Sequence, residues 1–371
     1  MESSGTFDPF STKQADLMYD KSRNILEKGL EEILEHGTKL LKEKRYDELR
    51  NFITEKTRGL DRERDIKELR PYSLIDLNED IASNREGLKS GWPAIDKDVR
   101  IPQEALTIIA GQPSHGKTTI LLNLFLNCIK QYPEQKFLFY SYEENSKQLI
   151  LKSIMNLSEY CFDEKNNYTK FEEHIKNGDT SIPQINDAVQ RIENLTKSKR
   201  MWFLDHGPEL EDLNNELNFL CNEQHIGGVF IDYIQRMKIK DSLNDRHKDL
   251  QIISNELLRM AKFYKIPIIL GAQLEKGEKI DNKVHLDQLR DAGYIEQDAN
   301  LILGVYNKSM IKARDGVSVK EQLVDLTLSI LKNRNGAVNS NTVLRFDRPV
   351  LKIRDFSTKK INNTKSKLTR L

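Results

Sequence analysis

The chain has 371 residues, of which 31% are charged and 38% hydrophobic, and its formal net charge at neutral pH is +1. The length allows two or more domains, and the near-zero net charge excludes a protein that binds nucleic acid through an overall basic surface, so any such site must be local. The three cysteines are far apart without metal-binding spacing, and no apolar run approaches the length of a membrane helix. We therefore expect a cytoplasmic protein with reduced cysteines and no membrane contact.

Residues 1–84 predict a helical N-terminal extension and linker. Apolar residues recur every three or four positions from about Arg23 to Leu60, a shorter helix is expected around Tyr46–Thr54, and another around Ser73–Ile81. Dense alternating charge over Thr57–Arg70 is typical of a solvated helix or linker. Two interpretations are equally open: an ordinary helical subdomain, or an arm that docks on a neighbouring subunit.

Residues 85–356 have a different character, because short strand-like apolar runs alternate with helical patterns. This alternation predicts parallel β-α units in a central sheet covered by helices, that is, an α/β fold. The polar, helical residues Tyr160–Lys199 predict an excursion from the sheet, and the basic segment 357–371 predicts a disordered tail. The predicted strands are Leu106–Ala110, Phe137–Tyr142, Met201–Leu204, Gly228–Ile231, Ile266–Ala272, Leu301–Val305, Leu326–Leu331 and Val343–Phe346.

The most informative motif is a G-x-x-x-x-G-K-T string between an apolar run and a helical pattern, which is the order strand, tight loop, helix. A loop of this kind turns successive backbone N–H groups inward and ends at a helix N-terminus, so it cradles a polyphosphate. We expect Lys117 to reach the β- and γ-phosphates of ATP and the Thr118 hydroxyl to hold Mg²⁺. The expected nucleotide-binding residues are Gly111, Gln112, Pro113, Ser114, His115, Gly116, Lys117, Thr118 and Thr119.

Three further strand-like runs each end in polar side chains suited to phosphoryl transfer. Asp232 ends one of them in a Walker B pattern and is expected to hold Mg²⁺ together with Thr118. Glu143 follows a second run and is expected to polarise the attacking water, since ligands bind at the carboxyl edge of a parallel sheet. Gln273 ends a third, where its amide can hydrogen-bond the γ-phosphate and report its loss.

Further strings of the chain match a single family when they are taken together with these motifs. The matching strings are Leu88–Asp96, Gly111–Thr119, Tyr140–Glu143, Ile231–Gln235, Gly271–Leu274, Leu289–Asp298 and Leu331–Gly336. In this order they resemble the RecA-type ATPase core of the DnaB family of replicative helicases, over roughly residues 85–356. The resemblance implies a RecA-like P-loop NTPase core with a central, mostly parallel sheet, preceded by the helical N-terminal extension.

The resemblance also implies roles for two other groups of residues. Lys332 and Arg334 match a basic pair that enters the ATP site of the next subunit in a homo-oligomeric ring, expected to be a hexamer. Arg290, Asp291 and Gly293 match a loop that lines the central channel, where contacts to the phosphates of single-stranded DNA are independent of sequence and sensitive to salt. From the residues alone, Arg290 and Asp291 would be interpreted as a surface ion pair.

The expected activity is that of an ATP-dependent DNA helicase of DnaB type, which translocates on single-stranded DNA and unwinds the duplex ahead. Polarity from 5′ to 3′ is implied by the resemblance. Two alternatives stay open: a RecA-like ATPase that remodels DNA or protein without unwinding, and a DNA-bound adaptor or loader whose ATP site is a switch.

Two departures from the family bear on this expectation. His115 stands where the family has a hydrophobic residue and is expected to be a tolerated loop side chain. Residues 1–84 do not resemble the family's usual N-terminal domain, which binds primase. The N-terminal helices are therefore candidates for contacting a replication or loading partner.

Overall fold

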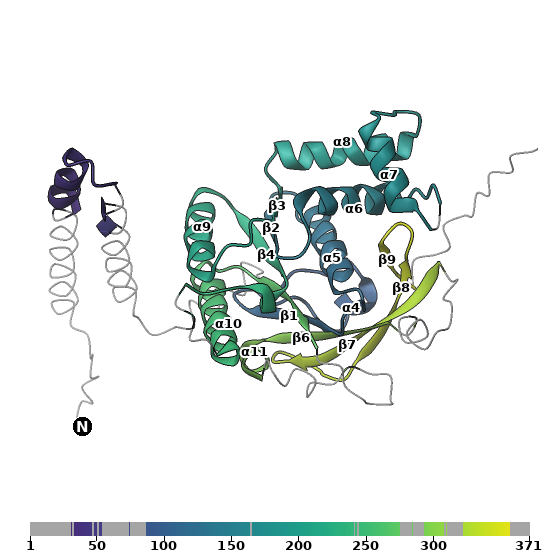
Figure 1. Cartoon of the computed structure of the whole chain (residues 1–371). Helices are drawn as coiled ribbons and strands as arrows, with labels where there is room; N and C mark the ends of the chain where they lie inside the picture. Colours follow the sequence, from purple (N-terminus) through teal and green to yellow (C-terminus); the bar gives the residue numbers. More distant parts are fainter. Residues whose placement is uncertain are drawn as a thin grey trace, which may run out of the picture. The chain divides into compact units, whose positions relative to one another are not determined.

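The computed structural model describes residues 31–53, 74 and 87–356, except 32, 47, 50, 51, 164, 241, 243, 244, 275–283, 285–292, 308 and 310–321. The chain divides into two units, Met1–Asn84 and Arg85–Leu371 (Figure 1). No helix within the described part of the chain is long and apolar enough to cross a membrane.

In the first unit, the described residues are helical over 33–42 and again at 46, 48, 49, 52 and 53. The rings of His36 and Phe52 meet edge to face, with 4.6 Å between their centroids. The two helical segments predicted here are therefore present and contact each other. The helix predicted around Ser73–Ile81 lies outside the described residues, apart from Leu74, which is helical.

The second unit is built on one sheet, whose nine strands among the described residues follow the order β3-β2-β4-β5-β1-β6-β7-β8-β9. Neighbouring strands are parallel from β3 to β6 and antiparallel from β6 to β9. The strands are β1 (Leu106–Gly111), β2 (Lys136–Ser141), β3 (Met201–Leu204), β4 (Ile226–Asp232), β5 (Ile268–Gln273), β6 (Leu301–Asn307), β7 (Leu323–Asn333), β8 (Asn341–Asp347) and β9 (Lys352–Asp355).

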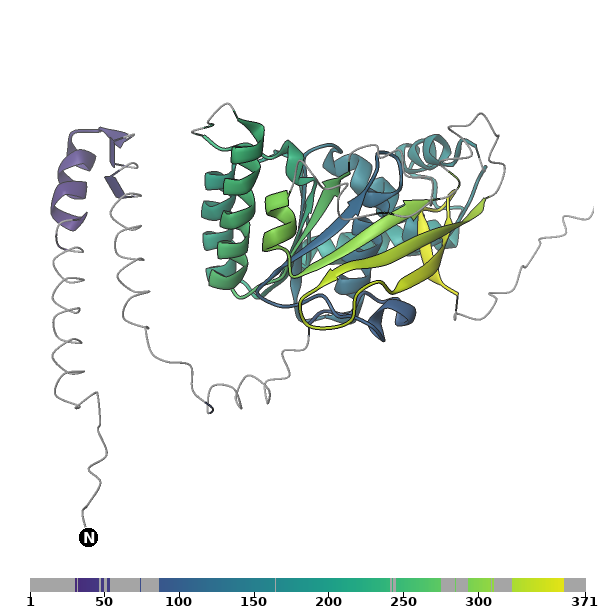
Figure 2. The same ribbon diagram turned by 90° about the horizontal axis from the view of Figure 1, so that it is seen from below.

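Helices cover both faces of this sheet (Figures 1 and 2). Leu106, Ile108 and Ala110 of β1 belong to one apolar core with α9 and α10, whereas Ile109 belongs to the other core with α5 and α6. Successive side chains of a strand point to opposite faces of the sheet, and helices bury both faces. Every residue of such a strand is therefore buried, which explains the continuous apolar runs in the sequence. The helices are α4 (Pro93–Asp96), α5 (Lys117–Gln131), α6 (Ser146–Ser158), α7 (Asn167–Lys176), α8 (Pro183–Lys197), α9 (Leu210–Glu223), η1 (Ile234–Arg236), α10 (Arg246–Phe263) and α11 (Gly293–Asp298).

All eight predicted strands are present, with ends that differ from the predicted ones by up to three residues, and a ninth strand was not predicted. Strand β5 begins at Ile268 rather than Ile266, since Pro267 has no N–H to donate to a neighbouring strand. Strand β9 was not predicted, because it is only four residues long and Ile353 is the single apolar side chain among them. The predicted excursion at Tyr160–Lys199 is confirmed: it contains α7 and α8, which pack against α6 (Figure 1).

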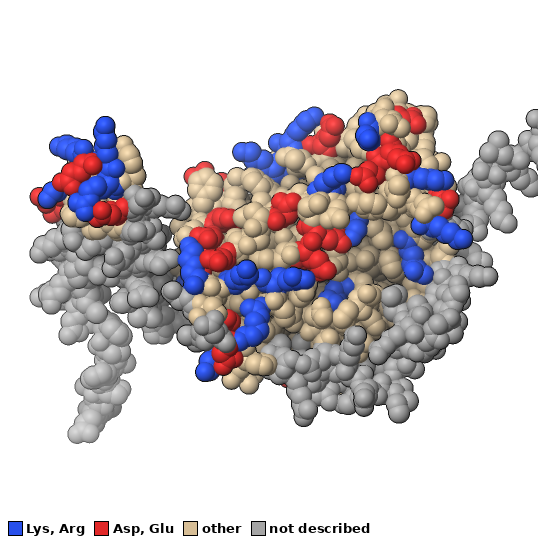
Figure 3. Space-filling model, in the orientation of Figure 1, with Lys and Arg blue, Asp and Glu red and all other residues tan. Residues whose placement is uncertain are grey.

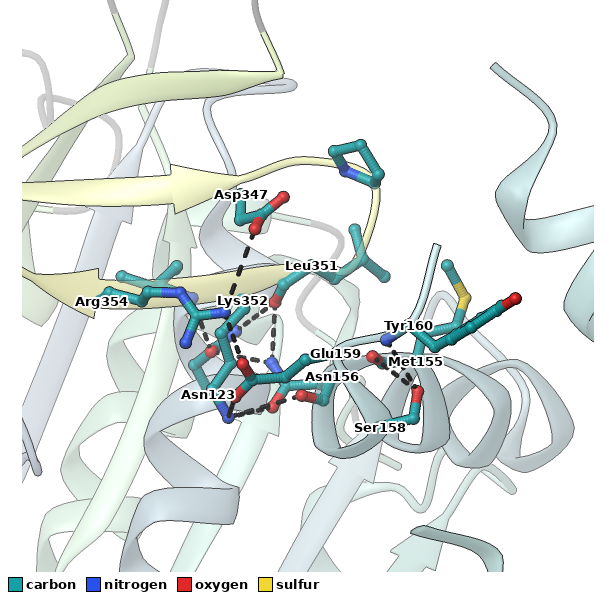
Figure 4. A network of polar contacts seen from close by, with 12 residues as sticks. Asn123, Met155, Asn156, Ser158, Glu159, Tyr160, Asp347, Leu351, Lys352 and Arg354 are labelled. Atoms are coloured by element: carbon teal, nitrogen blue, oxygen red, sulfur yellow. Dashed lines mark hydrogen bonds and ion pairs between the residues drawn. The ribbon is translucent and has the colours of Figure 1, made fainter. Parts of the chain in front are cut away.

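The β8–β9 hairpin is held on the helices by a network of polar side chains (Figure 4). Asn123 of α5 donates to the Leu351 carbonyl at 2.9 Å and accepts from the Ile353 N–H at 3.0 Å. Asn156 of α6 donates to the same Leu351 carbonyl at 2.8 Å and to the Asn123 side chain at 2.9 Å. Lys352 Nζ donates to Asn156 Oδ1 at 3.0 Å. Because α5 follows the glycine-rich loop, the network joins the last strands to the helix that bears this loop.

Candidate nucleotide site

The glycine-rich loop joins β1 to α5 and ends at the helix N-terminus. Ser114 and Gly116 adopt φ angles of 65° and 93°, in the left-handed region. Gly116 is the N-cap residue of α5 and supplies no side-chain cap. The first N–H groups of α5 are therefore available to an external acceptor, and a phosphate group is the acceptor that such a terminus favours.

Thr118, in the first turn of α5, meets the last residue of β4. Its Oγ1 donates a hydrogen bond to Oδ2 of Asp232 at 2.6 Å, and Asp232 is 1% exposed. Burial raises the pKa of Asp232 to about 6, although the hydrogen bond from Thr118 opposes this shift. A side chain at Gly271 of β5 would come within 3.0 Å of Asp232 Oδ1, so the glycine leaves room for the carboxylate.

The chemistry of this pair fits Mg²⁺. Asp232 Oδ1 is buried and has no hydrogen-bond partner within the described part of the chain. A buried carboxylate oxygen without a partner is costly, and a divalent cation beside it would remove that cost. No group of three or more His, Cys, Asp or Glu side chains suited to a metal occurs among the described residues. An ion held by Thr118 and Asp232 alone would need water and phosphate oxygens to complete its shell, which is how Mg²⁺ is usually bound.

Lys117 is the cation of the site. It is 9% exposed, and its Nζ donates to the Gln112 carbonyl of the same loop at 3.1 Å. Burial lowers the pKa of Lys117, while the nearby charges of Asp232 and Glu143 oppose that effect. A buried ammonium group that contacts a neutral carbonyl is placed to bind the negative charge of a phosphate.

Two adjacent glutamates follow β2 and differ in their surroundings. Glu144 forms an ion pair with Lys152, and its N–H donates to Ser141 Oγ at 3.0 Å. Glu143 is exposed and makes no hydrogen bond or ion pair with the residues that the structure describes. Its charge acts on both Asp232 and Lys117. Glu143 is therefore the carboxylate that is available to orient water beside the loop.

Gln273 ends β5, beside the first residue of the loop. The register of the parallel pair β1–β5 sets Gln273 opposite Gly111. Its side chain is exposed and forms no hydrogen bond within the described residues. Its main chain is bound by the side chain of Gln235: Gln235 Nε2 donates to the Gln273 carbonyl, and Gln235 Oε1 accepts from the Gln273 N–H, each at 3.1 Å.

His115 is not the tolerated loop side chain that the sequence led us to expect. It is 5% exposed, and its Nδ1 accepts a hydrogen bond from the Asn307 N–H of β6 at 3.2 Å. Burial, followed by the charge of Lys117, lowers the pKa of His115 to about 4. The neutral imidazole thus links the loop to β6, a partner that is 192 residues away in the sequence and is not indicated by the motif.

Lys332 and Arg334 lie at the end of β7 and bind α11 instead of the loop. Lys332 Nζ donates to the carbonyls of Glu296 and Gln297, the second at 3.2 Å, and the Arg334 guanidinium also donates to Gln297. Within the described residues, neither side chain forms a hydrogen bond or ion pair with the glycine-rich loop. The pair therefore does not join the nucleotide site of its own chain.

The expected DNA loop is described only at its end. Arg290 and Asp291 lie outside the described residues, and Gly293 is the first residue of α11. On the face shown in Figure 3, positive and negative side chains are both spread over the surface, in agreement with the net charge of +1.

Sequence reasoning missed the contacts that hold the site together from outside the motifs. Gln235 was part of a matching string but received no role, and Arg246 was not singled out. Arg246 donates to the Gln235 carbonyl at 2.5 Å and to the Met237 carbonyl at 3.1 Å. The available signal for Gln235 was its polar side chain three residues after Asp232, within the same matching string. The sequence offers no comparable signal for Arg246.

Comparisons with known proteins agree with this geometry. The model of the DnaB-like helicase C terminal domain family matches residues 87–355. The chain is 29% identical over 269 residues to a probable plasmid replicative DNA helicase of Chlamydia psittaci, which covers 71% of this chain and 54% of that protein. It is 31% identical over 282 residues to a probable replicative DNA helicase of Trieres chinensis, which covers 74% of this chain and 58% of that protein. The chain thus spans little more than half the length of these relatives.

A solved structure of a DnaB-like replicative helicase, described with its interactions with primase, has a similar fold. The TM-score is 0.70 at 20% sequence identity, over 90% of this chain and 76% of that chain. At this identity the likeness concerns the fold, and it agrees with the RecA-like core that the sequence predicted.

Proposed function

Because the chain belongs to the DnaB-like helicase C-terminal domain family, we propose that it is an ATP-dependent DNA helicase. It translocates along single-stranded DNA from 5′ to 3′ and unwinds the duplex ahead. Residues 85–356 act as the ATPase and helicase domain, residues 1–84 as a helical extension, and residues 357–371 as a basic tail. The observation that supports the ATP site of this helicase most strongly is the Thr118–Asp232 pair at the end of the glycine-rich loop, where one buried carboxylate oxygen has no partner among the described residues.

In the proposed reaction, the loop N–H groups and Lys117 bind the β- and γ-phosphates of ATP, and Thr118 and Asp232 hold Mg²⁺. The metal supplies positive charge to the transferring phosphoryl group when it is bound. Glu143 orients and accepts a proton from the attacking water, and the Gln273 amide contacts the γ-phosphate. Glu143 and the Gln273 side chain are exposed and form no hydrogen bond or ion pair within the described residues, which supports these two roles.

We also propose that the chain works as a ring, expected to be a hexamer. Arg334 and Lys332 then contact the ATP of the next subunit, since hydrolysis needs additional positive charge at the transition state. Their contacts with α11, away from the loop of their own chain, support action in trans. Arg290, Asp291 and Gly293 contact single-stranded DNA, and the helices within residues 1–84 contact a replication or loading partner.

A second candidate is an ATPase that remodels or loads without unwinding. It is supported by the range of the family match, which begins at residue 87 and does not cover residues 1–86. Every nucleotide contact would be the same in this case, so only a DNA assay separates the two functions.

The test is strand displacement on forked DNA that has either a 5′ or a 3′ single-stranded tail, with Lys117→Ala as the inactive control. Lys130→Ala is the matched control, because Lys130 is an exposed lysine at the other end of the same helix. Displacement that requires ATP, Lys117 and the 5′ tail is the expected result. Displacement from the 3′ tail would overturn the polarity, and DNA-stimulated hydrolysis without displacement would favour the second candidate.

A further inference from the structure

We infer that Gln235 is a positioning residue for Gln273: its side-chain amide fixes the main chain of the last residue of β5 and so directs the Gln273 side chain to the nucleotide. The inference rests on the proposed function, because the contact of Gln273 with the γ-phosphate is part of that proposal. It gives a role to Gln235, to which the motifs themselves assign none.

The amide of Gln235 takes the place of a missing strand neighbour. Alternate residues of a strand direct their N–H and C=O groups to opposite sides. The Leu274 N–H donates to the Gly111 carbonyl of β1, so the main-chain groups of Gln273 face the β4 side. On that side the pairing of β4 with β5 ends at Ile231 and Leu270, because the chain turns away into η1.

The Gln235 side chain fills this position with two hydrogen bonds of 3.1 Å, one to the carbonyl and one from the N–H of Gln273. A primary amide is suited to the task, because it carries a donor and an acceptor side by side, as a peptide group does. A carboxylate at this position would still accept from the Gln273 N–H, but its second oxygen would be repelled by the Gln273 carbonyl oxygen. A thioether would form neither hydrogen bond.

The main chain around Gln235 is fixed by a second set of hydrogen bonds. Arg246, the first residue of α10, donates from Nη2 to the Gln235 carbonyl at 2.5 Å and from Nη1 to the Met237 carbonyl at 3.1 Å. The preceding residue, Ile234, is fully buried. The Gln235 side chain that binds Gln273 therefore belongs to the turn that directly follows Asp232. This one short segment fixes the position of the carboxylate proposed to hold Mg²⁺ and of the Gln273 amide proposed to contact the γ-phosphate.

The experiment measures steady-state ATP hydrolysis by the full-length chain, with and without single-stranded DNA. The variants are Gln235→Met, Gln235→Glu, Gln273→Ala and the double variant Gln235→Met with Gln273→Ala. If Gln235 acts through Gln273, either Gln235 variant lowers kcat by about tenfold and changes KM for ATP by less than about twofold, since the loop that binds ATP is untouched. In the Gln273→Ala background, Gln235→Met then causes no further loss.

Each result has a separate meaning. A loss of kcat in Gln273→Ala together with wild-type kcat in both Gln235 variants would overturn the inference and leave the proposed function intact. Equal fractional losses from Gln235→Met in both backgrounds would also overturn it, because they would show an effect that does not pass through Gln273. Wild-type kcat in Gln273→Ala would remove the proposed role of Gln273, and with it the premise of the inference. Binding of a fluorescent ATP analogue and the melting temperature verify that each variant is folded.

Discussion

The hydroxyl of Thr118 donates to the carboxylate of Asp232 at 2.6 Å, although 114 residues separate the two in the sequence. The contact joins the first turn of α5 to the end of β4, and it does so within a fully buried environment for the carboxylate. Function and stability are therefore opposed at Asp232: a buried charge suits a metal ion but is costly in its absence.

Asp232→Asn should separate these two effects. The amide keeps the size of the side chain and an acceptor for Thr118 but loses the charge, so we expect hydrolysis to fall by about 100-fold or more. Without nucleotide and Mg²⁺, the variant should melt at a higher temperature than the wild type, because no buried carboxylate has to be desolvated. Initial rates and thermal unfolding measure both quantities. Asp187→Asn, at an exposed aspartate of α8, is the control, and a lower melting temperature for Asp232→Asn would contradict the argument.

Arg334→Ala should remove hydrolysis while leaving ATP binding in place. Because the guanidinium is proposed to act on the next subunit, mixing Arg334→Ala with Lys117→Ala chains should restore part of the activity: some interfaces then combine an intact loop with an intact arginine. The measurement is the rate of ATP hydrolysis as a function of mixing ratio. No recovery in rings shown to contain both chains would count against action in trans.

Arg290→Ala should weaken the binding of single-stranded DNA and lower the dependence of the affinity on salt. Loss of one phosphate contact reduces the slope of log K against log salt concentration by about 1. Fluorescence anisotropy at several salt concentrations gives this slope. Arg259→Ala, at an exposed arginine of α10, is the matched control. An unchanged affinity for Arg290→Ala would return Arg290 to the interpretation as a surface ion pair.

His115 should give the chain a measurable pH dependence of stability. Its pKa is lowered from 6.5 to about 4, so between these values the unfolded chain binds a proton that the folded chain does not. The contribution of His115 to the free energy of unfolding should therefore fall as pH is lowered from about 6.5 towards 4, by at most about 3 kcal/mol, whereas the raised pKa of Asp232 acts in the opposite direction. Lys117 is the charged neighbour that contributes to the shift.

The variant His115→Met tests this contribution, because methionine fills the space without titrating. Thermal unfolding at several values between pH 7.5 and pH 5 should show a smaller decline for His115→Met than for the wild type. His225→Gln, at an exposed histidine, should follow the wild type. The same decline in His115→Met and the wild type would show that another group is responsible.

Much of the fold could be predicted from the sequence because its signals are local. Apolar runs that are buried on both faces mark β1, β2, β4 and β6, and the glycine-rich loop is complete within nine consecutive residues, Gly111–Thr119. The same reasoning placed Glu143, Asp232 and Gln273 at one edge of the sheet, since the carboxyl ends of neighbouring parallel strands meet there. The edge strand β9 was missed because it depends on pairing with β8 and on the network around Asn123, rather than on its own hydrophobicity.

The sequence by itself determined the class of fold and the identity of the polar groups that we propose to contact the nucleotide, because both follow from periodicity and from motifs that lie close together in the chain. Only the tertiary structure decided which groups are paired and which are left unpaired. Among the described residues, Thr118 binds one oxygen of Asp232 and the other has no partner, His115 binds the Asn307 N–H, and the Gln235 side chain binds the main chain of Gln273 at the end of β5. The physical reason is that a hydrogen bond depends on distance in space, whereas a motif records only distance along the chain.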